Sequence, residues 1–218
     1  MKNILVLVEG PAEETFVRDV LAPYFIPFQV FIIPKVLVTK VVPGGTNFTG
    51  GHGKNYGHIQ KDLQLLLQNQ KHFLVTTMLD FYGLPSNTPG VDQTLSLSDC
   101  YDKVAKVEES IERAFSHPNL KIYLSLHEFE TFAFVDESLL ESLFPGNQAS
   151  IQTIKNIKQK FGNIEKINLE NPPSKRLQNV FSSYRKPFDG PLLASCLGID
   201  SLYQSCRHFA EWVDWIKA

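Results

Sequence analysis

Three short apolar runs in this chain each end in acidic residues, and this pattern constrains the fold more than any other feature. The acids are Glu9 after residues 4–8, Asp80 after residues 73–79, and Glu128 with Glu130 after residues 122–126. Runs of this kind suit buried strands of a parallel sheet, whose carboxyl ends lie along one edge. Four carboxylates gathered there would repel one another unless a cation lay among them. The sequence therefore predicts a divalent-metal site.

The composition is that of a globular protein, with 43% hydrophobic and 20% charged residues among 218. This length suits one large domain, or one domain with a small appendage. A formal net charge of −2 excludes a globally basic nucleic-acid coat protein, but it leaves room for a local basic surface.

The cysteines and the apolar runs favour a cytoplasmic protein. Cys100, Cys196 and Cys206 are odd in number and form no CxxC pair, so neither a disulfide framework nor a zinc ribbon is indicated. The apolar run at residues 4–8 is too short for a signal peptide, and no later run approaches the length of a membrane span. We expect no membrane association, and the sequence leaves the oligomeric state open.

The first part of the chain alternates between strand and helix patterns. The predicted elements are strand 4–8, helix 12–25, a strand or edge pair at 29–42, helix 58–69, strand 73–79, loop 82–97, helix 99–115 and strand 122–126. Pro11 suits a first helical turn, Pro34 belongs in an edge strand, and Asp99 or Ser98 is expected to cap a helix. This order predicts an α/β fold with a mostly parallel sheet flanked by helices.

From residue 136 onward, short helical patterns are separated by prolines and glycines. We predict an α/β core at residues 1–135 and a helical C-terminal extension at 136–218, packed on the core. Residues 151–190 contain eight Lys or Arg and three acids, an excess that could cover a polyanion. Solvated faces of small helices explain the same residues at least as well.

Glu9 lies where a strand ends, a glycine permits a tight turn and a helix begins. The next acids, Glu13 and Glu14, have a structural explanation, because acids are favoured at helix N-termini. Glu9 has no such explanation, since a carboxylate at the end of a buried strand is costly unless it is hydrogen-bonded or metal-bound. Glu13 is four residues further on and could reach the same site.

The other two acidic positions differ in how strongly they indicate a metal ligand. Asp80 precedes a turn signal and could simply cap that turn, but it occupies a place equivalent to that of Glu9. Residues 127–130 alternate polar and apolar, so an extended segment would point Glu128 and Glu130 one way and Phe129 into the core. His127 is expected to pack or to support a ligand rather than to bind the metal itself.

Ligands that are all oxygen favour Mg²⁺ or Mn²⁺ over zinc, and the sequence does not exclude calcium. Two such ions could clamp the attacking and leaving oxygens of a phosphoryl transfer. Charge on the phosphate could be stabilised by Lys175, Arg185 or Lys186. The glycine-rich residues 43–56 fail the P-loop pattern, because Gly53 and Lys54 are followed by Asn55. They are read as a loop that contacts backbone phosphates, or as a connector.

Several motifs together carry a family resemblance that spans nearly the whole chain. They are Leu7-Val8-Glu9-Gly10 with Glu13, residues 80–85 (DFYGLP), residues 127–130 (HEFE), residues 173–177 (PSKRL) and Tyr184-Arg185-Lys186. With these motifs the chain resembles the domain-of-unknown-function family 4276, which is similar to TOPRIM domains, especially those of the overcoming-lysogenization-defect (OLD) nucleases. TOPRIM folds hold Mg²⁺ with an early strand-end glutamate, matched by Glu9, and with an Asp-x-Asp pair, whose first member is matched by Asp80.

The resemblance implies a Mg²⁺-dependent nuclease that works beside a separately encoded ATPase in defence against phage or plasmids. Tyr82 stands where the second aspartate of the pair would be, so the metal site would need Glu128, Glu130 or Glu13, or would hold one ion. In the enzyme hypothesis the catalytic residues are Glu9, Asp80, Glu128 and Lys186, and nucleic acid is contacted by Lys175, Arg176, Arg185, Lys186 and Lys54. The alternative is a catalytically silent TOPRIM-like subunit that binds an ATPase or nucleic acid.

Overall fold

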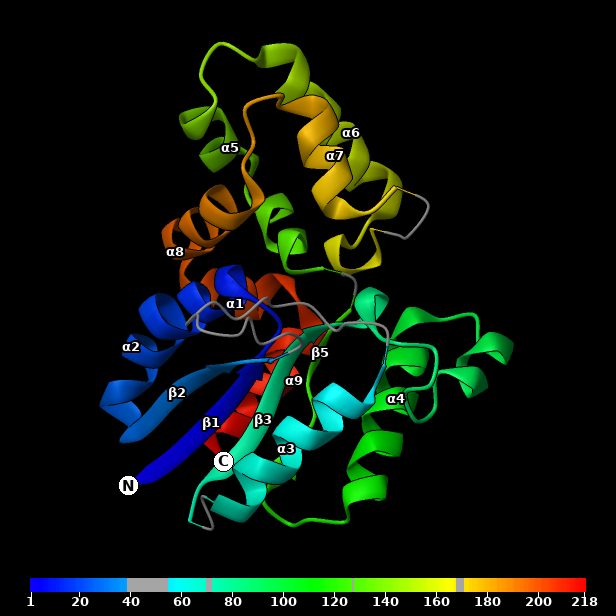
Figure 1. Cartoon of the computed structure of the whole chain (residues 1–218). Helices are drawn as coiled ribbons and strands as arrows, with labels where there is room; N and C mark the ends of the chain where they lie inside the picture. Colours follow the sequence, from blue (N-terminus) through cyan, green and yellow to red (C-terminus); the bar gives the residue numbers. More distant parts are fainter. Residues whose placement is uncertain (39–54, 70–71, 127, 168–170) are drawn as a thin grey trace, which may run out of the picture. The chain divides into compact units, whose positions relative to one another are not determined.

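The computed structural model describes residues 1–38, 55–69, 72–126, 128–167 and 171–218 (Figure 1). Its chain divides into two compact units, Met1–Ser125 and Leu126–Ala218, and each is described by itself. The division falls directly after the last strand, whereas the sequence pattern suggested a boundary at residues 135 and 136. Among the described residues, no helix has the length and apolar character needed to span a membrane.

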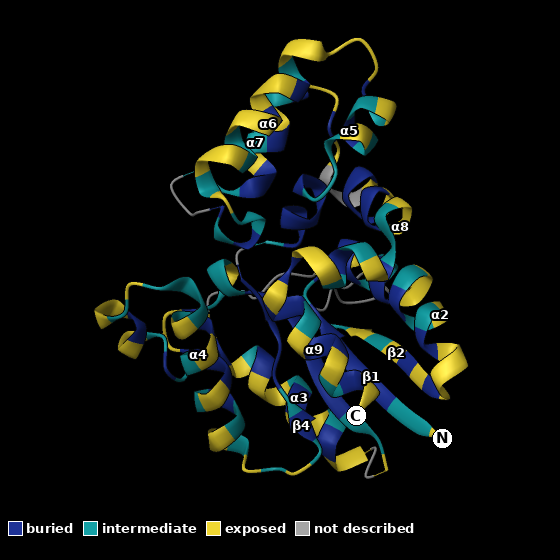
Figure 2. Cartoon of the chain, turned by 180° about the vertical axis from the view of Figure 1, so that it is seen from behind, coloured by how far each residue is buried: buried dark blue, intermediate teal, exposed yellow. Residues whose placement is uncertain are grey.

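A parallel sheet forms the centre of the first unit. Its strands are β1 (Lys2–Val8), β2 (Val30–Val36), β3 (Leu74–Asp80), β4 (Leu120–Lys121) and β5 (Leu124–Ser125). The order is β2-β1-β3-β4, β5 also pairs with β3, and every pairing is parallel (Figure 1). Figure 2 shows β1 buried along most of its length, as expected for a central strand. The predicted α/β fold with a mostly parallel sheet is confirmed.

The helices of the first unit connect successive strands. They are α1 (Pro11–Phe16), a π turn (Val17–Leu21), α2 (Ala22–Phe25), α3 (Gly57–Asn69) and α4 (Cys100–Phe115). Pro11 begins α1, and the Asp99 carboxylate caps α4 by accepting a hydrogen bond from the Tyr101 N–H, both as predicted. The helix predicted at 12–25 is confirmed, since residues 11–25 are helical without a gap, although residues 17–21 widen into a π turn shortly before Pro23, which has no N–H to donate.

The predicted edge strand is confirmed in part. β2 carries Pro34 opposite Val6 and pairs only with β1 among the described strands. A proline is tolerated there because an edge strand has one side without ladder partners. Of the predicted range, residues 39–42 lie outside the described residues, as does most of the glycine-rich loop.

The strand predicted at 122–126 is not continuous, because β4 and β5 are separated by Ile122 and Tyr123. The Thr77 hydroxyl donates to the Tyr123 carbonyl at 2.7 Å and accepts from the Tyr123 N–H at 3.0 Å. The Thr77 side chain thus takes the place of the backbone hydrogen bonds that would otherwise join β3 to Tyr123. Next to it, the Leu124 N–H donates to the buried Glu108 carboxylate at 2.8 Å.

The regular elements of the second unit are all helices among its described residues. Its elements are η5 (Phe129–Phe134, a 3₁₀ helix), α5 (Glu137–Leu143), α6 (Gln148–Phe161), η6 (Ile164–Lys166), α7 (Pro173–Val180), α8 (Lys186–Ser205) and α9 (Arg207–Lys217). Phe144 and Phe181 stack at 4.6 Å inside its apolar core. The buried Glu165 carboxylate accepts from the His208 N–H at the start of α9. The predicted helical texture is confirmed.

Candidate metal centre

Glu9 and Asp80 lie together at the carboxyl ends of two neighbouring strands. In the register of β1 and β3, Val8 lies opposite Met78, so both strands end at the same edge. The Glu9 Oε2 atom accepts a hydrogen bond from the Asp80 backbone N–H at 3.2 Å. Asp80 is 5% exposed, whereas Glu9 is partly exposed. The first unit thus brings together the two acids that the strand pattern singled out.

Glu13 follows Glu9 by four residues and is buried, and its carboxylate stabilises the start of α1. Its Oε2 atom accepts a hydrogen bond from the Gly10 N–H at 3.0 Å, which satisfies a backbone donor at the helix N-terminus. This geometry supports the structural explanation for Glu13. Its additional role as a metal ligand stays a prediction.

Glu128 anchors two elements of the second unit. Its carboxylate accepts hydrogen bonds from the Ser174 N–H at 2.8 Å and from the Ser174 hydroxyl at 3.0 Å, which ties the start of η5 to the start of α7. Neither the spacing nor the apolar pattern around Glu128 pointed to this partner. Glu128 thus has a structural role in addition to the ligand role predicted for it.

The extended segment predicted at 127–130 is wrong. Among the described residues 128–130, only Glu128 has extended backbone angles, and the chain then enters the 3₁₀ helix, closed by a hydrogen bond from the Thr131 N–H to the Glu128 carbonyl. Glu130 lies inside that helix and is 1% exposed, while Phe129 is buried in the core as predicted. His127 lies outside the described residues.

Glu128 and Glu130 belong to the second unit, whereas Glu9 and Asp80 belong to the first. The convergence of all four acids stays a prediction. Among the residues that the structure describes, no group of three or more His, Cys, Asp or Glu side chains is gathered for metal binding. Two carboxylates are nevertheless sufficient protein ligands for Mg²⁺, which usually keeps several waters and binds substrate phosphates. Glu9 meets the backbone of Asp80, and binding of one ion by both carboxylates stays a prediction.

Tyr184 and Asp189 lie near the acids of the second unit, and the sequence analysis pointed to neither contact. Burial, together with the negative charges of Glu130, Asp189 and Glu128, raises the pKa of Tyr184 far above its ordinary value, so the phenol stays neutral. The Asp189 carboxylate accepts from the Arg185 N–H at 2.6 Å and from the Arg185 side chain at 3.3 Å. The four-residue spacing of Arg185 and Asp189 was the one available signal.

Replacing Tyr184 by phenylalanine should leave stability unchanged or raise it by up to about 1 kcal/mol. The Tyr184 hydroxyl is buried and has no hydrogen-bond partner among the described residues, so its removal deletes a desolvated polar group and keeps the ring. Urea unfolding of the wild type and of Tyr184→Phe measures the difference. A loss of more than about 1 kcal/mol would show that the hydroxyl contributes a bond of ordinary strength.

The predicted cations differ in how accessible they are. Lys175 is exposed on α7, and the Arg176 guanidinium lies over the Phe161 ring at 5.1 Å. The Arg185 side chain is 69% exposed despite its contact with Asp189. Lys186 begins α8, but its side chain is outside the described part of the structure, and Lys54 is wholly outside it. Lys175 and Arg185 are therefore the most accessible of the described candidates.

Comparisons with known proteins identify a family. The model of the family described as Domain of unknown function (DUF4276) matches residues 8–217. A solved structure, the C-terminal region of the Xanthomonas campestris pv. campestris OLD protein, is 11% identical, with 97% of this chain and 96% of that chain covered. The TM-score of 0.37 is too low for this similarity to support an argument about fold or function. A search of curated proteins found no match.

Proposed function

We propose that this chain, which belongs to the DUF4276 family, is a metal-dependent nuclease that cleaves phosphodiester bonds of nucleic acid. The observation that carries the proposal is the hydrogen bond between the Glu9 carboxylate and the Asp80 N–H, at adjacent ends of two parallel strands. The carboxyl edge of a parallel sheet is where α/β proteins usually bind ligands. A carboxylate pair at this edge supports binding of Mg²⁺ or Mn²⁺.

In this proposal the residues divide into three groups by role. Glu9 and Asp80 hold the ion, which when bound polarises the phosphoryl oxygen. Glu128, Glu130 and Glu13 would complete the site or hold a second ion. Positive charge near the phosphate would come from Lys186 or Lys175.

The nucleic acid is proposed to bind through a restricted basic surface. Its members are Lys175, Arg176, Arg185, Lys186 and Lys54. A net charge of −2 supports a local surface rather than global attraction, and affinity should therefore fall as salt rises. A TOPRIM-like active site, a separately encoded ATPase partner and a role in defence against phage or plasmids complete the proposal, by the resemblance described above.

Calorimetric titration with Mn²⁺ and with Mg²⁺ tests the metal site. We expect the wild type to bind the ion and Glu9→Gln to weaken binding at least about tenfold, because one of few charged ligands becomes neutral. The matched control is Asp19→Asn, an exposed acid whose contact is with Arg18. The proposal fails if the wild type binds neither ion, or if Glu9→Gln binds as well as Asp19→Asn.

One observation favours a second candidate function. Tyr82 lies in the 3₁₀ turn Phe81–Gly83 that follows β3, in the place of the second aspartate of the resembled pair. A chain with this change could be a catalytically silent subunit that binds nucleic acid or an ATPase. Retained binding of a labelled oligonucleotide in a protein that binds no divalent ion would select this candidate.

A further inference from the structure

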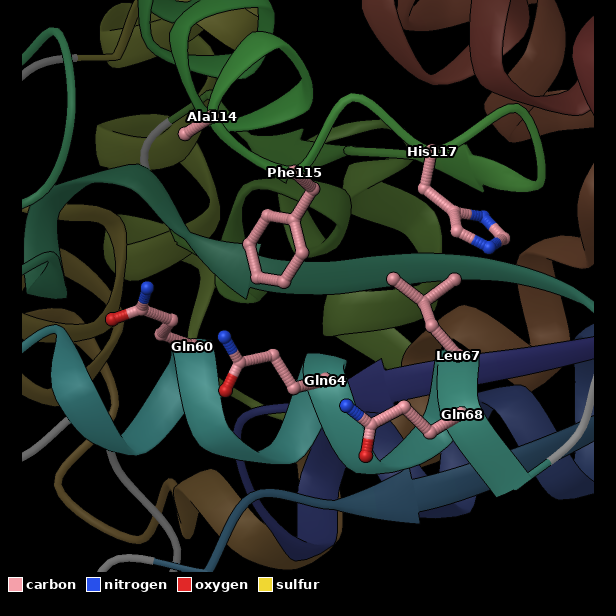
Figure 3. A pocket seen from close by; sticks show the side chains of 7 residues that line it. All are labelled: Gln60, Gln64, Leu67, Gln68, Ala114, Phe115 and His117. Atoms are coloured by element: carbon pink, nitrogen blue, oxygen red, sulfur yellow. The ribbon is translucent and has the colours of Figure 1, made fainter.

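A pocket of about 230 Å³ lies in the first unit, between α3 and the chain around the end of α4 (Figure 3). None of the residues that line it belongs to the candidate metal centre. Its lining includes Gln60, Gln64, Leu67, Gln68, Phe115 and His117. The first four come from α3, and Phe115 and His117 lie across from them (Figure 3).

The pocket carries three neutral amides in one row. Gln60, Gln64 and Gln68 are spaced by four residues, which places them on one face of α3. All three are exposed, and none of their side-chain amides makes a hydrogen bond with another group of the described residues. Each amide offers both a donor and an acceptor. Neighbouring amides of the row can therefore form hydrogen bonds with a neutral polar ligand.

Flat apolar surface completes the lining. Phe115 is partly buried, and Leu67 is buried on α3. The His117 Nδ1 atom accepts a hydrogen bond from the Asn119 N–H at 3.2 Å, so in the neutral ring the proton is on Nε2. None of the residues lining this pocket is a lysine, arginine, aspartate or glutamate. The lining offers nothing with which to hold a phosphate, and it favours an uncharged ring.

We propose that this pocket binds one nucleobase, either of a free nucleoside or of an unpaired nucleotide in a strand. Glutamine amides pair with the adjacent donor and acceptor of adenine, and bases stack on aromatic side chains. The volume is below the range of roughly 300 to 1,000 Å³ that suits drug-sized ligands, and it therefore fits a single base. The proposal is independent of metal binding and of cleavage.

Titration of the ¹⁵N-labelled full chain with nucleosides, followed by NMR of the side-chain amides, tests the pocket. Adenosine should shift the signals of Gln64 and of at least one of its neighbours Gln60 and Gln68, because the row is about 12 Å long and one base spans only part of it. Ribose 5-phosphate, which has no base, should not shift them. Gln64→Ala should weaken adenosine binding about threefold to tenfold through loss of a hydrogen bond. The control Gln204→Ala, an exposed glutamine of α8, should bind as the wild type does.

A short single-stranded oligonucleotide distinguishes the two sources of the base. Shifts of the same glutamine signals by the oligonucleotide but not by adenosine would assign the pocket to an unpaired base in a strand. Shifts by adenosine would show that a base alone suffices. The proposal is overturned if neither probe shifts these signals, if ribose 5-phosphate shifts them equally, or if Gln64→Ala binds as well as Gln204→Ala.

Discussion

Asp80→Asn should lower Mg²⁺-dependent cleavage of nucleic acid by about a hundredfold or more. Metal-ion stabilisation of a transition state is worth several kcal/mol, and each loss of about 1.36 kcal/mol slows a reaction tenfold. The substitution keeps the side-chain shape and the backbone N–H that donates to Glu9. It therefore removes a charge at the proposed ion and leaves the pairing of the two strand ends intact.

Cleavage of a fluorescent oligonucleotide at saturating Mg²⁺ measures this loss, with thermal unfolding as the check on folding. Asp19→Asn is again the control, because it removes one carboxylate from an exposed position on the π turn. EDTA should abolish the wild-type activity. Activity of folded Asp80→Asn within a few-fold of the control would exclude Asp80 as a ligand and remove the basis of the nuclease proposal.

Thr77→Val should destabilise the chain by about 2 to 5 kcal/mol. The fully buried Thr77 hydroxyl makes two hydrogen bonds with Tyr123, at 2.7 and 3.0 Å, and loss of a buried partner costs about 1 to 3 kcal/mol for each group. Valine has nearly the same shape, so the core packing is kept. The free energy of unfolding from urea titration gives the difference directly.

Thr153→Val provides the matched comparison. Thr153 is exposed on α6, and its hydroxyl bonds only a carbonyl within its own helix, so the same substitution should change stability by no more than about 0.5 kcal/mol. If Thr77→Val cost no more than Thr153→Val, the Thr77 side chain would not be what joins β3 to the break between β4 and β5.

The elements that depend on near neighbours in the chain were predictable. Asp99 caps α4, Pro11 begins α1 and Pro34 lies in an edge strand, because capping and proline geometry act within a few residues. The pairing of Glu9 with Asp80 followed from one further rule, that parallel strands end at a common edge. Their meeting was therefore inferred without knowledge of any side-chain contact.

The features that the sequence missed depend on partners far along the chain. Thr77 interrupts the predicted strand through Tyr123, and Ser174 holds Glu128, each across a separation of 46 residues. The acids around Tyr184 likewise come from both η5 and the start of α8. Hydrophobic periodicity does not predict such a contact, because it indicates only which face of its own helix or strand a residue occupies.

The α/β class, the parallel direction of the strands and the helical character of the C-terminal part were predictable from the order of residues. These depend on local hydrophobic periodicity and turn chemistry. The folded structure alone showed which carboxylates meet a hydrogen-bond donor, where the last strand breaks and which residues line the pocket between α3 and the end of α4. Those outcomes depend on how separate elements pack, because the side chains concerned are bound by groups that the chain order does not bring together.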